Sequence, residues 1–314
     1  MTPPLGARPV PVMDRALGGR ADALRLRQFL IDSYALAGRE FNWEPRRWEG
    51  MFWTVAGERL ADPGWGAGVH VWQAQDGSIV AAAIPDGPGD LALQVDPRHR
   101  WLEDDVLDWA ERHLAALDDT GARVLHTWAF EWDDDRKSRL SGRGYAPVAG
   151  WSWQHRRRPT SRAVEPPPLA TGYVLRTAAD SVDDARRWVE ATNAVFGHST
   201  LVEKYCSFLG SPSYDPQLHI AVEASDGSVV AFAGFTVDSV NRVATLEPVG
   251  TRDGHRRLGL AQAAICEGLQ RVARRAVDVV HVANWGPADA GHLYGALGFE
   301  HYATQNAWRK VLPP

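Results

Sequence analysis

The stretch Glu247-Pro-Val-Gly-Thr-Arg-Asp-Gly-His-Arg-Arg-Leu-Gly-Leu-Ala261 decides the fold of this 314-residue chain. The run from Val243 to Val249 is apolar and rich in β-branched residues, which predicts a buried strand. From Gln262 onward, apolar residues recur at helical spacing. The stretch therefore predicts a strand, a glycine-containing turn and a helix start in immediate succession.

The turn has the composition of a phosphate-binding loop. Small residues at Gly259 and Ala261 let backbone N–H groups approach a ligand closely, and the N-terminus of the following helix favours an anion. Arg256 and Arg257 supply the countercharge. A single loop of this kind is also compatible with a plain helix cap. The expected pyrophosphate-binding loop comprises Arg256, Arg257, Leu258, Gly259, Leu260 and Ala261.

A second motif strengthens this interpretation. After another apolar strand, Val277 to Val282, comes the segment Ala290-Gly-His-Leu-Tyr-Gly-Ala-Leu-Gly-Phe299. With both motifs, the sequence resembles the GNAT superfamily of acyl-CoA-dependent N-acyltransferases from Tyr173 to the C-terminus. The family's pyrophosphate loop reads Arg/Gln-x-x-Gly-x-Gly/Ala, and its second motif is a Leu-Tyr pair followed by Gly-Phe. The matching residues are Arg256, Gly259 and Ala261 for the loop and Leu293, Tyr294, Gly298 and Phe299 for the second motif.

The resemblance implies acetyl-CoA as co-substrate and assigns roles to residues of this chain. Tyr294 matches the tyrosine that donates a proton to the CoA sulfur, although a core tyrosine on an apolar helix face is the alternative. Glu247 stands where many members keep a carboxylate that acts as a base, and an ion-paired glutamate at a strand end is the alternative. Pro248 removes a ladder donor, which fits the splayed strand where this fold admits its cofactor.

The remaining cofactor contacts come from the strand end and from the next strand. Backbone N–H groups of Val249, Gly250 and Thr251 lie where the family polarises the thioester carbonyl. The family often has an asparagine seven residues before its tyrosine, and that position is Pro287 here. Asn284, three residues earlier, is the candidate substitute.

The two halves of the chain repeat one another. Asp76-Gly-Ser parallels Asp226-Gly-Ser at an offset of 150 residues, and Gly144-Tyr145 parallels Gly298-Phe299. The resemblance therefore implies an α/β (α+β) protein of two tandem GNAT folds, each a mixed, mostly antiparallel sheet flanked by helices. Mycothiol synthase has a similar tandem layout. We expect a degenerate N-terminal domain over residues 1–155, a Pro-rich linker over 156–171 and an acyl-CoA-binding domain over 172–314.

The N-terminal copy lacks the features of the loop. It has His99-Arg-Trp-Leu-Glu-Asp104 in place of Arg256 to Ala261, and carboxylates at a helix N-terminus occupy the field that attracts a phosphate. Leu140 takes the place of Tyr294. We expect this copy to have lost cofactor binding. In the same half, the residues through Gly19 predict an irregular lead-in, and Leu102 to Leu117 predicts a helix.

Composition restricts the function further. A net charge of -5 does not favour a nucleic-acid or membrane partner, and two cysteines do not make a disulfide framework, so a cytoplasmic protein is expected. No His, Cys and carboxylate cluster has metal-ligand spacing, so no metal is expected. His281 and His292 are further titratable candidates, with structural roles as the alternative.

These observations favour an N-acetyltransferase that acts on a primary amine of a small molecule by direct transfer, as a monomer or homodimer. Two alternatives remain: a mycothiol synthase-like acetyltransferase, and a sensor that binds acyl-CoA without turnover. The aromatic and basic run from Asn42 to Trp53 predicts a packed helix or a pocket wall.

Overall fold

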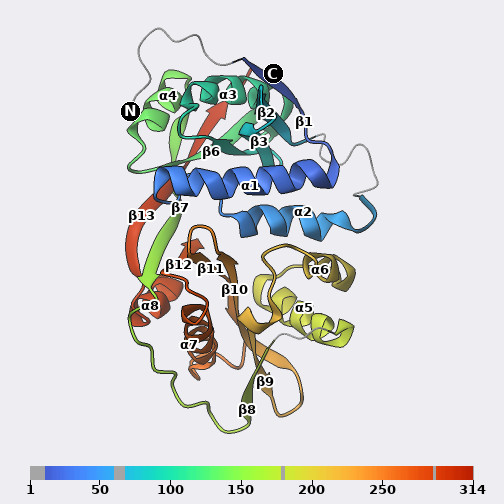
Figure 1. The fold of residues 1–314 in the computed structure, drawn as a ribbon, viewed down its shortest axis with the longest axis vertical. Coiled ribbons are helices and arrows are strands. Elements are labelled where there is room, and N and C mark those ends of the chain that lie inside the picture. The colour runs from blue at the N-terminus through green and yellow to red at the C-terminus, as the bar shows by residue number, and fades with distance from the viewer. Residues whose placement is uncertain (1–10, 60–67, 178–180, 286–287, 314) are drawn as a thin grey trace. The chain divides into compact units, whose positions relative to one another are not determined.

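The computed structural model describes residues 11–59, 68–177, 181–285 and 288–313 (Figure 1). These residues form eight α-helices and thirteen strands. The chain forms two compact units that do not follow chain order. The N-terminal unit draws on residues 1–43, 60–151 and 306–314, and the C-terminal unit on residues 44–59 and 152–305. The expected boundaries therefore differ from these units, because a helix from the first half belongs to the C-terminal unit and the last strand ends in the N-terminal unit.

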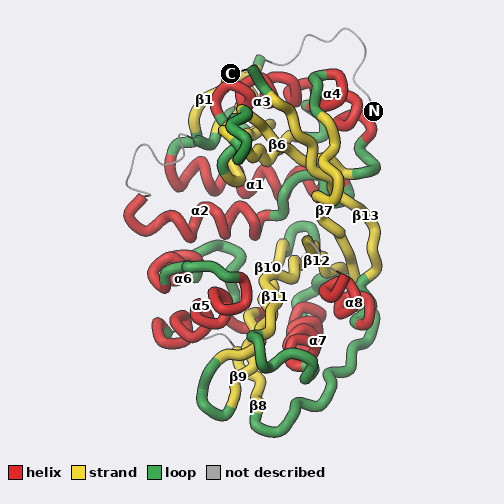
Figure 2. The backbone as a smooth tube through the Cα atoms, turned by 180° about the vertical axis from the view of Figure 1, so that it is seen from behind, coloured by secondary structure: helices red, strands yellow, loops and turns green. Residues whose placement is uncertain are grey.

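The strands of the N-terminal unit follow the order β1-β2-β3-β4-β6, and the short β5 pairs with β6. Helices α1 and α3 both contact β3 and lie on opposite sides of the strands (Figures 1 and 2). The elements are β1 (Val12–Ala16), α1 (Gly19–Ala37), β2 (His70–Ala74), β3 (Ile79–Gly87), β4 (Asp90–Val95), a 3-10 turn (Arg100–Leu102), α3 (Glu103–His113), β5 (Ala116–Leu117), β6 (Arg123–Phe130) and α4 (Asp134–Gly142).

In the C-terminal unit the strands follow the order β12-β11-β10-β9-β8, with β7 on the outer side of β12. Helices α7 and α8 cover one side of these strands, and α5 and α6 the other (Figure 2). The elements are α2 (Pro45–Arg59), β8 (Tyr173–Thr177), α5 (Val182–Phe196), α6 (Val202–Phe208), a 3-10 turn (Pro216–Leu218), β9 (His219–Ala224), β10 (Val229–Asp238), β11 (Val243–Thr251), α7 (Leu260–Ala273), β12 (Val279–Trp285) and α8 (Ala288–Ala296). Two further strands, β7 (Ala146–Pro159) and β13 (Glu300–Val311), contribute residues to both units.

The core of the C-terminal unit explains why α7 lies where it does. Ile265, Leu269 and Val272 are spaced at helical intervals, and all are buried against the apolar face of the strands. Gly268 lets the helix approach the sheet, because a Cβ there would stand 2.1 Å from the ring of Phe235. This close contact lets the middle of α7 pack directly on β10.

Three expectations about the elements were wrong. The expected irregular lead-in contains β1, which pairs antiparallel with β2. The helix expected to reach Leu117 ends at His113, because Ala116 and Leu117 pair with β6 instead. The expected linker begins within β7, whose residues 153–159 pair with β12.

The residues Arg156 to Arg158 belong to strand β7 rather than to a linker, because Arg158 is buried. Arg158 is 1% exposed and donates to the backbone carbonyls of Leu297, Arg162 and Ala163 at 2.7–2.9 Å. Carbonyl oxygens therefore satisfy the buried guanidinium without a carboxylate. The following segment packs along α7, where Val164 and Leu169 contact the core.

Candidate active site

The predicted pyrophosphate loop has the backbone geometry of an anion site. Gly259 is the N-cap of α7 with φ 72°, and no side chain caps the N–H groups of the first turn. Arg257 also has a positive φ, 63°. Residues 256–259 are exposed, and the first turn of α7 contains no acidic residue. The helix N-terminus is therefore directed at solvent with its partial positive charge uncompensated.

Arg256 connects this loop to the end of β11. Its Nη2 lies 3.0 Å from Asp253 and its Nε donates to the carbonyl of Thr251 at 3.4 Å. The Arg256 side chain is 62% exposed, so its ion pair with Asp253 is a weak surface contact that an anionic ligand can replace.

The end of β11 separates from its parallel neighbour. Pairing between β11 and β12 ends at Thr245 and His281, whereas pairing with β10 continues to Thr251. From Leu246 onward one edge of β11 is not paired with β12. The predicted contacts Val249, Gly250 and Thr251 lie in this section, which can offer backbone groups to a ligand.

A β-bulge sits at the start of the separated section. The register of β10 and β11 shifts between Ala233 and Phe235, so Glu247 and Pro248 together oppose Gly234. A Cβ on Gly234 would stand 2.9 Å from both the Glu247 carbonyl oxygen and Pro248 Cδ, so the site requires glycine. Bulges redirect side chains, and this one carries the candidate base.

Tyr294 lies on α8 with its ring in the core, 6% exposed, and packs edge-on against Phe299 at 5.9 Å. Burial, and secondarily the negative charge of Glu247, raise its pKa to about 12. The phenol is therefore protonated at physiological pH. The two predicted catalytic residues thus interact electrostatically, although they come from different elements.

Glu247 has a partner that the sequence did not indicate. Nη1 of Arg46, at the start of α2, lies 3.3 Å from its Oε1. The glutamate side chain is 49% exposed and that of Arg46 is 18% exposed. The prediction for Asn42 to Trp53 was a packed helix or pocket wall, and the interleaving of arginine with tryptophan was the signal that could have located Arg46.

Two other predicted residues lie apart from the loop. Asn284 on β12 is 8% exposed, and its Oδ1 is buried without a hydrogen bond from any residue that the structure describes. Pro287 lies outside the described residues. His281 is buried and packs against Tyr302 at 5.8 Å, which favours its structural alternative.

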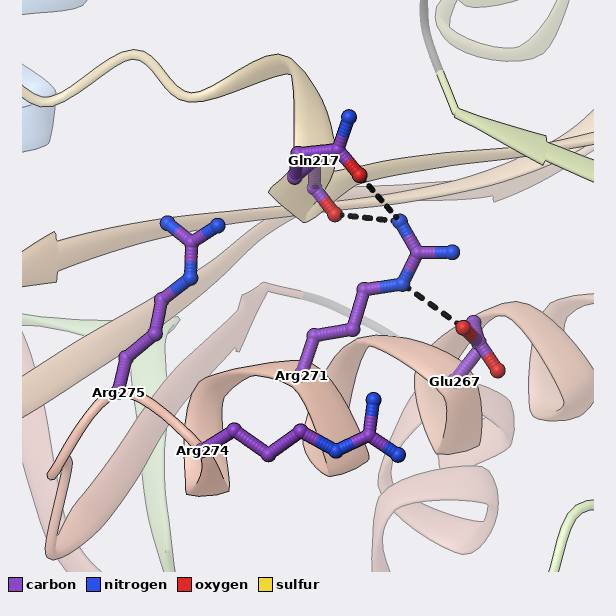
Figure 3. A pocket seen from close by; sticks show the side chains of 5 residues that line it. All are labelled: Gln217, Glu267, Arg271, Arg274 and Arg275. Carbon is purple, nitrogen blue, oxygen red and sulfur yellow. Dashed lines mark hydrogen bonds and ion pairs between the residues drawn. The ribbon is translucent and has the colours of Figure 1, made fainter.

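A surface pocket lies at the other end of α7 and is separate from this site (Figure 3). Arg271 in this pocket donates to Glu267 at 2.7 Å and to the Gln217 carbonyl at 2.8 Å. Cations at a helix C-terminus stabilise its dipole, so a structural role accounts for these arginines. Among the described residues, no group of His, Cys, Asp or Glu could hold a metal ion, and no helix could cross a membrane.

Comparison with known proteins identifies the family of this chain. The profile of the Acetyltransferase (GNAT) family matches residues 183–299, which include the bulge, the loop and Tyr294. Mycothiol acetyltransferase of Kineococcus radiotolerans is 30% identical over 259 residues, 76% of this chain and 80% of that protein. The chain belongs to the GNAT acetyltransferase family.

Solved structures show the same fold over the full length. A tandem GNAT protein from the clavulanic acid biosynthesis pathway has a TM-score of 0.66 at 18% identity, covering 97% of this chain and 99% of that chain. A GCN5-related N-acetyltransferase from Sphaerobacter thermophilus has a TM-score of 0.64 at 22% identity, covering 96% of each chain. The predicted fold class, two tandem GNAT folds, is confirmed, and the family's co-substrate is acetyl-CoA.

Proposed function

We propose that the C-terminal unit transfers the acetyl group of acetyl-CoA to a primary amine of a small molecule, by direct transfer in a ternary complex. The observation that carries this proposal is the exposed start of α7 at Gly259, which no side chain caps, together with the separated end of β11 that carries Glu247. Tyr294 and Glu247 are the candidate acid and base. A protonated phenol and a carboxylate are the acid and the base that such a transfer uses.

The residues present fit the co-substrate. The uncapped N–H groups at Gly259, Leu260 and Ala261 suit a pyrophosphate, and Arg256 and Arg257 add positive charge. Backbone N–H groups in the section from Val249 to Thr251 suit the pantetheine arm and the thioester carbonyl. The buried amide oxygen of Asn284 is a further acceptor for the arm. When bound, acetyl-CoA supplies an acetyl group activated as a thioester.

Under this proposal, Glu247 and Tyr294 each carry out one of the two proton transfers of the reaction. Glu247 accepts a proton from the amine, directly or through water, so that the nitrogen attacks the carbonyl carbon as a C–N bond forms and the C–S bond breaks. Tyr294 donates its proton to the leaving sulfur. The products are an amide and the CoA thiol, and one proton passes through each residue.

The expected setting is a cytoplasmic enzyme, monomeric or homodimeric, without a nucleic-acid, membrane or metal partner. A chain with a net charge of -5 attracts a cationic amine better than an anion. This charge supports a small amine as the acceptor.

The test is an acetylation assay of the full chain with acetyl-CoA and a panel of primary amines, read by product mass and thiol release. Intersecting initial-rate lines and an amide product are expected, and Glu247→Gln should lower kcat/KM at neutral pH about 10- to 100-fold. Parallel lines would overturn direct transfer. Tight binding of acetyl-CoA without turnover of any amine would favour the sensor alternative.

A second candidate function follows from the 30% identity to mycothiol acetyltransferase. Under this proposal the chain acts on the same acceptor as that relative. Competition between this acceptor and simple amines in the same assay distinguishes the two, because the natural acceptor will show the higher kcat/KM.

A further inference from the structure

Helix α2 brings a cation to the candidate base. Although α2 is encoded in the first half of the chain, it belongs to the C-terminal unit and packs on α6. Arg46 in its first turn reaches Oε1 of Glu247 at 3.3 Å. The site therefore presents a carboxylate and a guanidinium side by side.

A buried contact holds α2 in this position. Glu49 is 0% exposed and accepts hydrogen bonds from the backbone N–H of Ser213 at 3.0 Å and from its hydroxyl at 2.7 Å. Arg46 and Glu49 are three residues apart, so they share one face of the helix. Docking of Glu49 thus sets the position from which Arg46 reaches the base.

The charge of Arg46 is only partly compensated. Its Nε is buried with no hydrogen-bond acceptor among the residues described, and the guanidinium stands 5.7 Å from the centre of the Phe208 ring. Its ion pair with the half-exposed Glu247 is a long one, at 3.3 Å. A desolvated cation gains from a second anion, because one surface contact does not offset its loss of hydration.

The neighbouring histidine adds no charge to this cluster. His219 is 1% exposed, and neither ring nitrogen has a hydrogen-bond partner in the described part of the chain. Trp188 and Tyr214 pack against its ring at 5.4 and 4.7 Å. Burial, with the charge of Arg46, lowers its pKa to about 3, so the imidazole is neutral. Arg46 therefore provides the positive charge beside Glu247.

From this juxtaposition we propose that the acceptor is a zwitterion, an α-amino acid or an equivalent amine with a carboxylate on the adjacent carbon. Its amine faces Glu247 and its carboxylate pairs with Arg46. The two ligand groups are joined to one carbon, which matches a base and a guanidinium in direct contact. This inference rests on the proposed function and makes Arg46 a specificity residue for it.

The experiment compares each protein α-amino acid that has a primary amine with its own α-carboxamide as acceptor, using the full chain and acetyl-CoA. The amide keeps the amine and side chain but removes the negative charge. We expect kcat/KM to favour the acid by about 10- to 100-fold for the best side chain, the range of a charge-assisted contact. In Arg46→Gln this ratio should fall to about 1, whatever the change in the rate with the amide, and Arg46→Lys should restore part of it.

Arg47→Gln is the matched control, since the adjacent guanidinium stands 5.6 Å from the centre of the Trp153 ring. It should keep the ratio, and acetyl-CoA titration checks that each variant folds. Equal rates for acid and amide, or an unchanged ratio in Arg46→Gln, would overturn the zwitterion while leaving amine acetylation standing. Failure to acetylate any acid, amide or other amine would overturn both proposals.

Discussion

The two copies of the fold share their backbone framework and differ in the groups that face a ligand. In the first copy the hairpin turn has Ala74 N–H donating to the Ser78 carbonyl at 2.9 Å, and in the second Ala224 donates to Ser228 at 3.0 Å. The Asp76 carboxylate accepts from the Ser78 N–H at 2.9 Å, as Asp226 does from Ser228. The turns are equivalent, and the strand that follows each of them is similar in sequence.

The helix N-termini show the largest difference. Glu103 starts α3, is 0% exposed and is paired at 3.0 Å with both Arg100 and Arg136. The first copy thus places its own carboxylates and arginines at the start of its helix, whereas the first turn of α7 contains no acidic residue. In the first copy, an internal network of ion pairs therefore occupies the position at which an external anion would bind.

The two copies also differ in how the equivalent strands pair. Ile84 stands 150 positions before Gly234 and pairs with Ala92 in a ladder that runs without a shift from Ala81 to Pro85. In the second copy a bulge at Gly234 redirects Glu247. A buried Ile84 maintains a regular sheet, while glycine permits the irregular section that a site needs.

The closing motif keeps its backbone and changes its side chain. Tyr145 N–H donates to the Leu140 carbonyl at 3.0 Å, and Phe299 N–H donates to the Tyr294 carbonyl at 2.9 Å. Leu140 is fully buried and offers no proton. The fold therefore persists without the loop, the bulge or the tyrosine, and each of these differences gives a way to test whether the first copy binds the cofactor.

The largest effect is expected for Gly259→Glu, which gives the loop a carboxylate like that of the first copy. The charge opposes a phosphate at the helix N-terminus and the side chain is strained at φ 72°, so acetyl-CoA affinity should fall by about 100-fold or more. Calorimetric titration should give one site per chain before the change and none after it. Asp104→Ala in the first copy is the control and should leave binding intact. Two sites per wild-type chain would contradict the assignment of cofactor binding to one copy.

Tyr294→Phe tests the acid that Leu140 cannot replace. We expect kcat to fall about 100-fold with little change in acetyl-CoA affinity. Because the pKa of Tyr294 is raised to about 12, the wild-type rate should not decline through its ionisation below pH 10. Tyr145→Phe, which loses a 3.2 Å hydrogen bond to Glu111, should leave kcat unchanged. A normal rate in Tyr294→Phe would show that Tyr294 serves in core packing and not as the acid.

His219→Val replaces a buried imidazole by the residue found 150 positions earlier, Val69. The folded pKa of about 3 lies below the ordinary 6.5, so stability is complete above pH 6.5 and is lost as pH falls towards 3, where the unfolded chain binds the proton. The wild type should lose roughly 3 kcal/mol by pH 4 from this group, and the variant should lose less. Urea unfolding at pH 7 and pH 4 measures the difference. Identical pH dependence would show that His219 is not held neutral.

Gly234→Ala has the smallest expected effect on the fold. The added Cβ meets the Glu247 carbonyl at 2.9 Å, so the bulge must shift at a cost of about 1–3 kcal/mol. Thermal unfolding should show the loss, and kcat should fall because Glu247 moves. Ala83→Gly, in the regular ladder of the first copy, should cost about 0.5–1 kcal/mol without altering kcat. Full activity in Gly234→Ala would mean that the bulge does not position the base.

Much of the fold could be predicted from local sequence. The bounds of α5 follow from its local sequence, because Ser181 caps its start by accepting from the Asp184 N–H and Gly197 ends it at φ 67°. Strands β7 and β13 were not predicted, because their polar sequences form strands only through pairing partners distant in the chain. The roles of the predicted site residues remain predictions, although their placement on the strand end, the loop and α8 follows from the motifs.

What the sequence by itself determined is which copy has a helix N-terminus suited to an anion, because a small residue at Gly259, adjacent arginines and the absence of carboxylates act locally on that terminus. Tertiary structure decided which groups meet there. The burial of Tyr294, the bulge opposite Gly234 and the ion pair of Arg46 with Glu247 all depend on contacts between residues far apart in the chain. Such contacts leave no fixed spacing in the sequence, because packing between elements, rather than local periodicity, brings the side chains together.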